Sequence, residues 1–375
     1  MSHWTTRTLL ALGLLLSGSA AAGRTWVVAL DGSGDFTLIS AACTAAASGD
    51  TIRIRPGQYD EPQYSGYNKP WFNVYDKSLT IFGSGADPSS VVITFALGIG
   101  SGPATGQVVV QDVTFQGPTG RLGIWARVLD VGDCVFLGTG TGPSAGWGQM
   151  PLESYAVESA LVHDCLFQGN IAISGGAANV PSAIDIVGHG EVIRDCVFED
   201  NVTDAEDAGA LLISAEPEDA CLVEGCVFLG NQAPQGAAIC GFRTVVRNCT
   251  FYGNQGTGCM WCSYLLGFWN QVYNCIVTAT KGGNICDDGS MPGIEEYCCD
   301  IWGNEVGDPG PPVGMHDCFS LDPLLCDPTN GDVTLHSDSP CVNATGCGVV
   351  GAKGIGCGDS PIKVTTWGRL KFSYK

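Results

Sequence analysis

A short pattern built on Cys-x-Phe recurs along the middle of the chain and constrains the fold more than any other feature. It reads "CVFLGN" at 226–231, and eight copies or weaker relatives start at 111, 132, 163, 194, 224, 247, 273 and 297. Their aligned apolar residues are Phe115, Phe136, Phe167, Phe198, Phe228, Phe251, Val277 and Ile301. Intervals of 21 to 31 residues, with strand-like alternation inside each copy, indicate a stacked solenoid.

The Cys and the Phe of each copy lie two residues apart, so both side chains point to the same face of a short strand. Such a strand cannot bury a Phe alone, but stacking the copies at about 4.8 Å builds a continuous interior column. We expect buried thiols rather than a metal or redox array, because reactive thiols need exposure and positive surroundings. The predicted column consists of Cys134, Cys165, Cys196, Cys226, Cys249, Cys275 and Cys299.

An Asn follows the Phe by three residues in most copies, usually after a Gly. Asn tolerates the left-handed conformation that a tight turn needs, and stacked Asn side chains can form an amide ladder between coils. The residues concerned are Asn170, Asn201, Asn231, Asn254 and Asn304. The repeat is therefore interpreted as scaffold rather than as a catalytic unit.

The net charge of the chain limits its binding partners, and the N-terminal segment indicates its cellular location. The chain has 17 basic and 38 acidic residues, and this net charge of −21 argues against nucleic acid as a partner. Residues 1–22 are predicted to be a signal peptide, because the apolar run from Leu9 to Ala22 is too short to span a bilayer and ends in small residues. With no later transmembrane segment expected, we predict a secreted or cell-surface protein, periplasmic or extracellular and of bacterial type.

Three parts of the chain resemble known β-helix proteins. The Phe-x-x-Asn copies and the segments "GGAAN", "GALL" and "GAAI" that follow them resemble the repeats of chlamydial polymorphic outer-membrane adhesins. "DGSGDF" at 31–36 and "PGQYDE" at 56–61 resemble the opening of pectin methylesterases, and 322–358 resembles the terminal segment of secreted right-handed parallel β-helix proteins. These resemblances imply an all-β fold, a right-handed parallel β-helix solenoid over 23–357, with a short basic tail at 358–375.

Both ends of the predicted solenoid need covering. The Ala-rich segment Thr37–Ala47 is expected to form a short helix over the first coil, with Ile39, Ala42, Cys43 and Ala46 on its inner face. At the other end, a cluster of cysteines outside the column predicts disulfides: Cys318, Cys326, Cys341, Cys347 and Cys357. The tail is either a plain terminus or a sorting or surface-attachment signal.

The catalytic motifs of the resembled families are not present. Pectin methylesterases need "DFIFG" and "LGRPW", and neither occurs in this chain. "GHG" at 188–190 also occurs in polygalacturonases, but it lacks the accompanying "NTD" and "RIK" and falls where the repeat requires a turn. Asp185 and His189 remain as a candidate catalytic pair.

Two further sets of residues are candidates for binding. Asp200, Asp204 and Asp207 lie in an acidic run that is either a Ca²⁺ site or a solvated acidic rim. Trp147 and Tyr155 lie in a Gly-rich interruption of the repeat, 139–160, where aromatic rings can stack on a sugar. Apart from Ca²⁺, no cofactor is expected.

These observations predict an exported, non-catalytic β-helix protein that binds a polysaccharide or cell-surface glycan along a lateral face. The alternative is a carbohydrate-active enzyme, a polysaccharide lyase or glycoside hydrolase, with an unrecognised site. The fold hosts both classes, so the choice depends on whether one groove holds a cluster of carboxylates.

Overall fold

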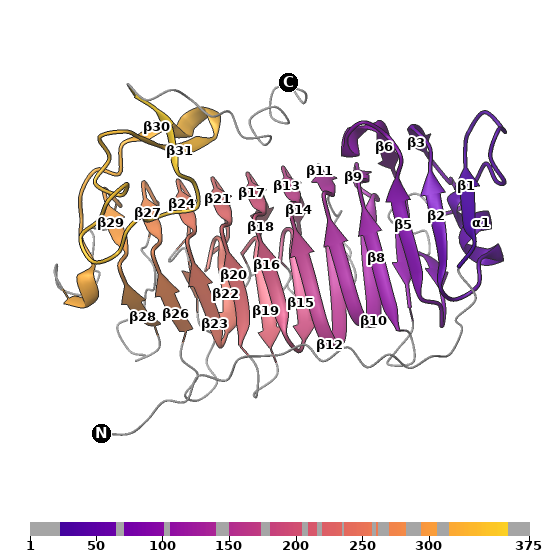
Figure 1. Cartoon of the computed structure of the whole chain (residues 1–375), viewed down its shortest axis with the longest axis horizontal. Coiled ribbons are helices and arrows are strands. Elements are labelled where there is room, and N and C mark those ends of the chain that lie inside the picture. The colour runs from indigo at the N-terminus through magenta and orange to yellow at the C-terminus, as the bar shows by residue number, and fades with distance from the viewer. Residues whose placement is uncertain are drawn as a thin grey trace.

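The computed structural model describes residues 23–64, 71–100, 106–139, 150–173, 181–204, 209–215, 220–234, 236–256, 260–261, 270–282, 294–305 and 315–358. The predicted signal peptide and the tail beyond residue 358 lie outside these ranges. The described residues form a parallel β-solenoid with one short α-helix, α1, and three 3-10 turns (Figure 1). The predicted fold class is confirmed. No helix in the described ranges is long and apolar enough to cross a membrane.

Sheet A is the largest sheet, and most coils contribute two segments to it. Its first limb contains β4 (Phe72–Val74), β7 (Ala96–Ile99), the start of β10 (Arg121–Gly132) and of β12 (Leu152–His163), β15 (Ile184–Gly188), β19 (Leu211–Ala215), β22 (Ile239–Phe242) and β25 (Met260–Trp261). Its second limb contains β1 (Thr25–Val28), β2 (Asp50–Ile54), β5 (Leu79–Gly83), β8 (Gln107–Gln111), the ends of β10 and β12, β16 (Glu191–Arg194), β20 (Cys221–Glu224), β23 (Thr244–Arg247), β26 (Asn270–Tyr273) and β28 (Ile294–Tyr297).

Sheet B is formed by the Phe-containing repeat strands. They are β3 (Gly57–Tyr59), β6 (Val91–Ile93), β9 (Thr114–Gln116), β11 (Val135–Leu137), β13 (Leu166–Gln168), β17 (Val197–Glu199), β21 (Val227–Leu229), β24 (Thr250–Tyr252), β27 (Ile276–Thr278) and β29 (Asp300–Trp302). A narrow sheet C follows, with β14 (Ile171–Ala172) and β18 (Val202–Thr203). The 3-10 turns are η1 (Pro88–Ser90), η2 (Met315–Asp317) and η3 (Pro328–Asn330).

The predicted interior columns are present. Phe rings of six successive coils stack at centroid distances of 4.6–5.2 Å, with interplanar angles of 9° or less. The seven predicted column cysteines are fully buried free thiols. Each donates to the carbonyl oxygen two residues earlier, as Cys196 does to Arg194 at 3.2 Å, and burial raises the pKa of Cys196 well above its usual range. Because all seven are shielded from solvent, we interpret these thiols as structural.

The predicted amide ladder is present over four of its five residues; the fifth, Asn304, instead accepts from Thr280 Oγ1 at 2.7 Å. Asn170 donates through Nδ2 to Oδ1 of Asn201 at 2.8 Å, and Asn201 does the same to Asn231 at 2.9 Å. Asn231 continues the ladder to Asn254 at 3.0 Å. Each of these amides also donates to the carbonyl oxygen of a Phe in the preceding coil. The buried turns are thus hydrogen-bonded from coil to coil.

The N-terminal helix covers the first coil as predicted. Helix α1 (Ile39–Ala45) lies beside β1 and β2 at one end of the solenoid (Figure 1). Ile39, Ala42 and Cys43 are fully buried and join the main core. Lys77 Nζ donates to the carbonyl oxygens of Cys43 and Thr44 at 3.0 and 2.8 Å, so the C-terminal end of the helix is satisfied.

The C-terminal segment covers the opposite end and part of the outer face of sheet B (Figure 1). It contains sheet D, with β30 (Leu325–Asp327), β31 (Asp332–His336) and β32 (Ile355–Cys357). Val333 of β31 packs in an apolar cluster with Val227 and Leu229 of sheet B. The backbone N–H of Ala352 donates to Thr250 Oγ1 at 2.9 Å, which fixes the segment to the repeat.

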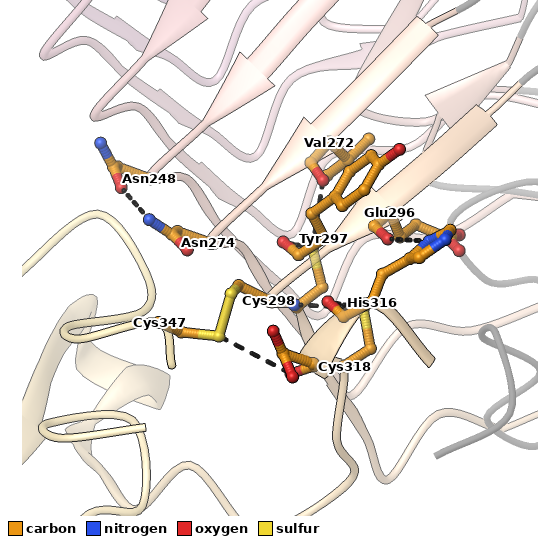
Figure 2. The surroundings of a disulfide bond; sticks show 11 residues. Asn248, Val272, Asn274, Glu296, Tyr297, Cys298, His316, Cys318 and Cys347 are labelled. Atoms are coloured by element: carbon orange, nitrogen blue, oxygen red, sulfur yellow. Dashed lines mark hydrogen bonds between the residues drawn. A yellow bond between two sulfur atoms is a disulfide. The ribbon is translucent and has the colours of Figure 1, made fainter. Parts of the chain in front are cut away.

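Two disulfides hold this segment, and the prediction of its cysteines needs correction. Cys326 pairs with Cys357 inside sheet D, but Cys347 pairs with Cys298, which belongs to the last repeat (Figure 2). Cys298 occupies the turn between sheets A and B that is Asp or Asn in most other coils, and it has the same positive φ, 58°. The prediction was wrong for two residues that are buried free thiols, Cys318 and Cys341.

Both of these thiols have structural partners. Cys318 extends the cysteine column, where its Sγ accepts from the backbone N–H of Cys299 at 3.4 Å. Cys341 donates through Sγ to Oδ2 of the buried Asp300 at 3.1 Å. Packing against the last coil therefore explains why neither thiol is oxidised.

Candidate active site on sheet A

The first limb of sheet A presents one row of outward-facing residues that differs from the rest of the surface. Its inward row is entirely apolar and buried: Leu97, Leu122, Leu152, Ile184 and Leu211. Because side chains alternate along a strand, the next residue on each strand points outward. In register, this outer row reads Asn73, Gly98, Gly123, Glu153, Asp185 and Leu212.

Two tryptophans lie over the glycines of this row. A Cβ on Gly123 would lie 2.6 Å from Cζ3 of Trp71 and 3.0 Å from Cη2 of Trp125, so both indoles rest against the bare backbone there. The two ring centroids are 6.4 Å apart and the rings are tilted by 59°. Together the two half-buried rings form an aromatic platform on the sheet.

Arg121 lies at the start of β10, on the same face as Gly123. Its guanidinium carbon is 5.2 Å from the centroid of the Trp71 ring, a cation–π arrangement, and the residue is only 5% exposed. Its charge also lowers the pKa of the nearby Glu153 carboxyl, which opposes the effect of burial on that group. The platform and the acidic residues are thus linked by one cation.

Glu153 and Asp185 are carboxylic acids directly opposite each other on adjacent parallel strands, β12 and β15. Neighbouring strands lie about 4.8 Å apart, so the two side chains leave the sheet together. Asp185 is 4% exposed, and its Oδ1 is buried with no hydrogen-bond partner among the described residues. A buried carboxylate of this kind favours the protonated form.

The two carboxyl groups have raised pKa values. Burial, with a further contribution from the negative charge of Glu153, raises the pKa of Asp185 to about 7. Burial also raises the pKa of Glu153, although Arg121 partly offsets the effect. Near neutral pH the pair can therefore hold one proton between a donor and a carboxylate, which is the requirement for acid–base and nucleophilic chemistry.

The structure separates the catalytic pair predicted from the sequence. Asp185 lies at the site, but His189 is in the "GHG" turn after β15, four residues further along the chain. Four residues of extended strand correspond to about 13 Å. The carboxyl group opposite Asp185 belongs to Glu153 instead. The assignment of "GHG" to a turn agrees with positive φ at Gly188 and Gly190.

Of the predicted sugar-stacking pair, Trp147 lies outside the described residues. Tyr155 is in β12, where it is 41% exposed and in register with Trp125 on one side and Val187 on the other. It lies two residues after Glu153, on the same outward face. Tyr155 therefore extends the aromatic surface beside the carboxyl pair.

The predicted Ca²⁺ ligands do not form a described cluster. Asp200 and Asp204 are exposed, the first at a turn with φ of 53°, and Asp207 lies outside the described residues. Within the described ranges, three potential ligand atoms come within 4.8 Å of one another at Cys298, Asp317 and Cys347. Those two sulfurs are joined in a disulfide, so they offer no thiolate to a metal. Calcium binding stays a prediction.

Four residues of the site were missed from the sequence: Trp71, Arg121, Trp125 and Glu153. The available signal was the alternation in "RLGIWA" and "LESYA", which leaves Trp125, Glu153 and Tyr155 on the polar side. An alignment of the coils on their Phe residues does not place Glu153 opposite Asp185. Asp185 lies 13 residues before Phe198, whereas Glu153 lies 14 residues before Phe167. The irregularity within the β10–β12 pairing accounts for this offset, since Ala126 pairs with Ala156 but Val128 with Ser159.

Comparisons with known proteins give no family for the chain. No protein-family model and no curated protein matches the sequence. Among solved structures, a pectin methylesterase from carrot superposes with a TM-score of 0.37 and 15% identity, over 81% of this chain and 90% of that one. A rice weevil pectin methyl esterase gives a TM-score of 0.37 and 11% identity, over 81% and 92%. At such TM-scores neither likeness supports a conclusion about fold or activity.

Proposed function

We propose that the protein is a carbohydrate-active enzyme that hydrolyses glycosidic bonds at the Glu153–Asp185 pair. The observation that carries the proposal is the facing of two carboxyl groups on adjacent strands, one of them buried with a pKa of about 7. The Trp71–Trp125 platform beside the pair suits the apolar face of a sugar ring. This is the enzymatic alternative left open by the sequence, rather than the non-catalytic function expected first.

The geometry favours a reaction in two steps. The strand spacing of about 4.8 Å is nearer to the separation of about 5–5.5 Å in retaining glycosidases than to the wider spacing of inverting ones. Glu153 would attack the anomeric carbon while protonated Asp185 gives its proton to the leaving oxygen. Asp185 would then take a proton from water as that water cleaves the glycosyl–Glu153 ester, which regenerates both groups.

The charge of the molecule indicates an uncharged substrate. A net charge of −21 repels polyuronates, and Arg121 is engaged with Trp71 rather than with solvent. We therefore propose a neutral polysaccharide, met in a secreted or cell-surface location. The raised pKa of Asp185 also suits a donor that must stay protonated close to neutral pH.

The test is incubation of the full mature chain with neutral polysaccharides and with polygalacturonate, both methyl-esterified and free. New reducing ends are expected from a neutral polymer, and they should be absent in Glu153→Gln and Asp185→Asn. Asp338→Asn, at an exposed carboxyl remote from sheet A, is the matched control and should keep full activity. Unsaturated products would indicate a lyase, and released methanol an esterase; either would overturn the hydrolase assignment.

Non-catalytic glycan binding is the second candidate, and the exposed Tyr155 beside Trp125 is the observation that favours it. In that case the wild type would bind a neutral polysaccharide without forming any product. Binding would then persist in Asp185→Asn and weaken in a Trp125→Ala, Tyr155→Ala double variant. Formation of reducing ends by the wild type excludes this candidate as the full function.

A further inference from the structure

A second groove lies on a different surface of the solenoid, along sheet C. It has a volume of about 620 Å³ and is lined by residues of five successive coils, among them Gln232, Gln255, Lys281 and Glu305. These residues directly follow the ladder position of each coil, which is Thr280 before Lys281 and an Asn in the others, whereas Glu153 and Asp185 lie on the first limb of sheet A. The groove is therefore separate from the carboxyl pair.

The groove residues form a regular row. Val202 pairs in parallel with Gln232, Gln232 with Gln255, and Gln255 with Lys281. Backbone hydrogen bonds hold the row in place: the N–H groups of Gln232 and Gln255 donate to the backbone carbonyl oxygens of Asn201 and Asn231, each at 2.8 Å. Exposed side chains thus project into the groove at intervals of about 4.8 Å.

The side chains of this row are free, in contrast to the neighbouring ladder. Asn231 and Asn254 use their amides to bond each other, as stacked amides do. The amides of Gln232 and Gln255 and the ammonium of Lys281 have no hydrogen-bond or ion-pair partner among the described residues. A row of unused donors and acceptors on a rigid backbone is ready to bind a polar chain without the cost of breaking internal bonds.

An extended peptide is the less suitable ligand. The row presents its face rather than an edge, and its backbone groups are already bonded between coils, as in Thr203 N–H to Gln232 O at 2.9 Å and Ala233 N–H to Gln255 O at 3.1 Å. Addition of a peptide strand needs free backbone groups at an edge. The row instead offers side-chain amides, which pair well with hydroxyl groups.

We infer that the row Gln232, Gln255 and Lys281, which continues sheet C across the following coils, is a second carbohydrate-binding surface that holds a linear neutral polysaccharide lengthwise across the coils. The interval between coils is close to the length of one sugar unit in an extended chain, so Gln232, Gln255 and Lys281 can each contact successive units. The net charge of −21 again disfavours a polyanion. This surface does not depend on the chemistry proposed for Glu153 and Asp185.

The test is isothermal titration of cellohexaose, xylohexaose and mannohexaose into the full mature chain. A Trp125→Ala, Tyr155→Ala, Asp185→Asn background disables the sheet A site for both binding and turnover, so the two proposals fail independently. In this background we expect one of the hexasaccharides to bind, and Gln232→Ala with Gln255→Ala to weaken that binding about tenfold through loss of two hydrogen bonds. The matched control is Gln107→Ala with Gln116→Ala, two exposed glutamines on other faces, which should leave the affinity unchanged.

Circular dichroism melting of each variant establishes that it is folded. Equal affinity in the Gln232, Gln255 double variant and in its background would overturn the inference, as would failure of all three hexasaccharides to bind. Binding of an extended Gly-Ser hexapeptide that the same double variant weakens, without hexasaccharide binding, would assign the row to polypeptide and overturn it as well.

Discussion

A carboxyl group that is 4% exposed, with one oxygen lacking a hydrogen-bond partner among the described residues, is costly to ionise. Asp185 bears this cost at a position where the inner face of the same strand is fully apolar. Functional sites commonly retain groups that weaken the fold, because chemistry needs a perturbed pKa. We therefore expect a change at Asp185 to alter the free energy of unfolding as well as the activity.

Asp185→Asn should stabilise the protein at alkaline pH. The folded-state pKa of about 7 lies above the unfolded value near 3.8, so the wild-type free energy of unfolding falls as pH rises from 4 to 7. Three units of pKa correspond to a cost on the order of 4 kcal/mol above pH 7, to which burial contributes most and the charge of Glu153 contributes the rest. Urea unfolding at pH 4, 6 and 8 should show a gain for the variant at pH 8 that fades toward pH 4. A gain independent of pH would contradict this.

Cys196→Asp should cost several kcal/mol, because it places an unpaired charge inside the column. Cys196→Ala, which removes only the sulfur, is the comparison and should cost much less. Thermal melting of both variants measures the difference. If Cys196→Asp melts at the wild-type temperature, the thiol is not buried as described.

At the scale of elements, the strands that repeat most regularly could be predicted, whereas only Asp185 and Tyr155 of the proposed site could. The Cys, Phe and Asn columns follow from fixed offsets within sheet B, and helix α1 follows from the apolar face of Ile39, Ala42 and Cys43. The site lies on the first limb of sheet A, where turns of variable length and the β10–β12 irregularity break the alignment. Only pairing in three dimensions brings Glu153 opposite Asp185.

Gly123→Ala tests whether the first limb depends on its aromatic platform. The added Cβ would meet Trp71 at 2.6 Å and Trp125 at 3.0 Å, so at least one indole must move. We expect binding and turnover of a neutral polysaccharide to fall by about tenfold or more, with little change in melting temperature because the site faces outward. Gly354→Ala is the control, since a Cβ there meets nothing within 4 Å. Unchanged turnover in Gly123→Ala would remove the platform from the mechanism.

At the scale of the whole molecule, the solenoid is covered at both ends by different means. Helix α1 contributes apolar side chains to the core at one end, whereas the segment 315–358 is held to the other by the Cys298–Cys347 disulfide (Figure 2). Beside that disulfide, Tyr297 stacks on His316 with ring centroids 4.5 Å apart. The last coil is thus tied to its cover by both a covalent bond and ring packing.

Cys298→Ser with Cys347→Ser should loosen this cover without unfolding the coils. The disulfide closes a sequence separation of 49 residues, and its loss should cost about 2–4 kcal/mol of local stability. Limited proteolysis is expected to remove the C-terminal segment from the double variant and leave the solenoid intact. Cys326→Ser with Cys357→Ser, which cuts only a link within sheet D, should release the segment more slowly. Equal cleavage rates in the two double variants would refute this role.

The cysteine column also requires that the chain fold before its thiols are exposed to an oxidant. Twelve buried free cysteines lie among the described residues, while four others form the two disulfides. In the unfolded chain these thiols compete for the same partners, and the native pairs are a small fraction of the possible ones. Coil stacking must therefore be faster than thiol oxidation, so that the column cysteines are buried before Cys298 and Cys347 form their disulfide. Refolding in oxidised glutathione should trap mispaired chains that refolding in reductant, followed by air, avoids.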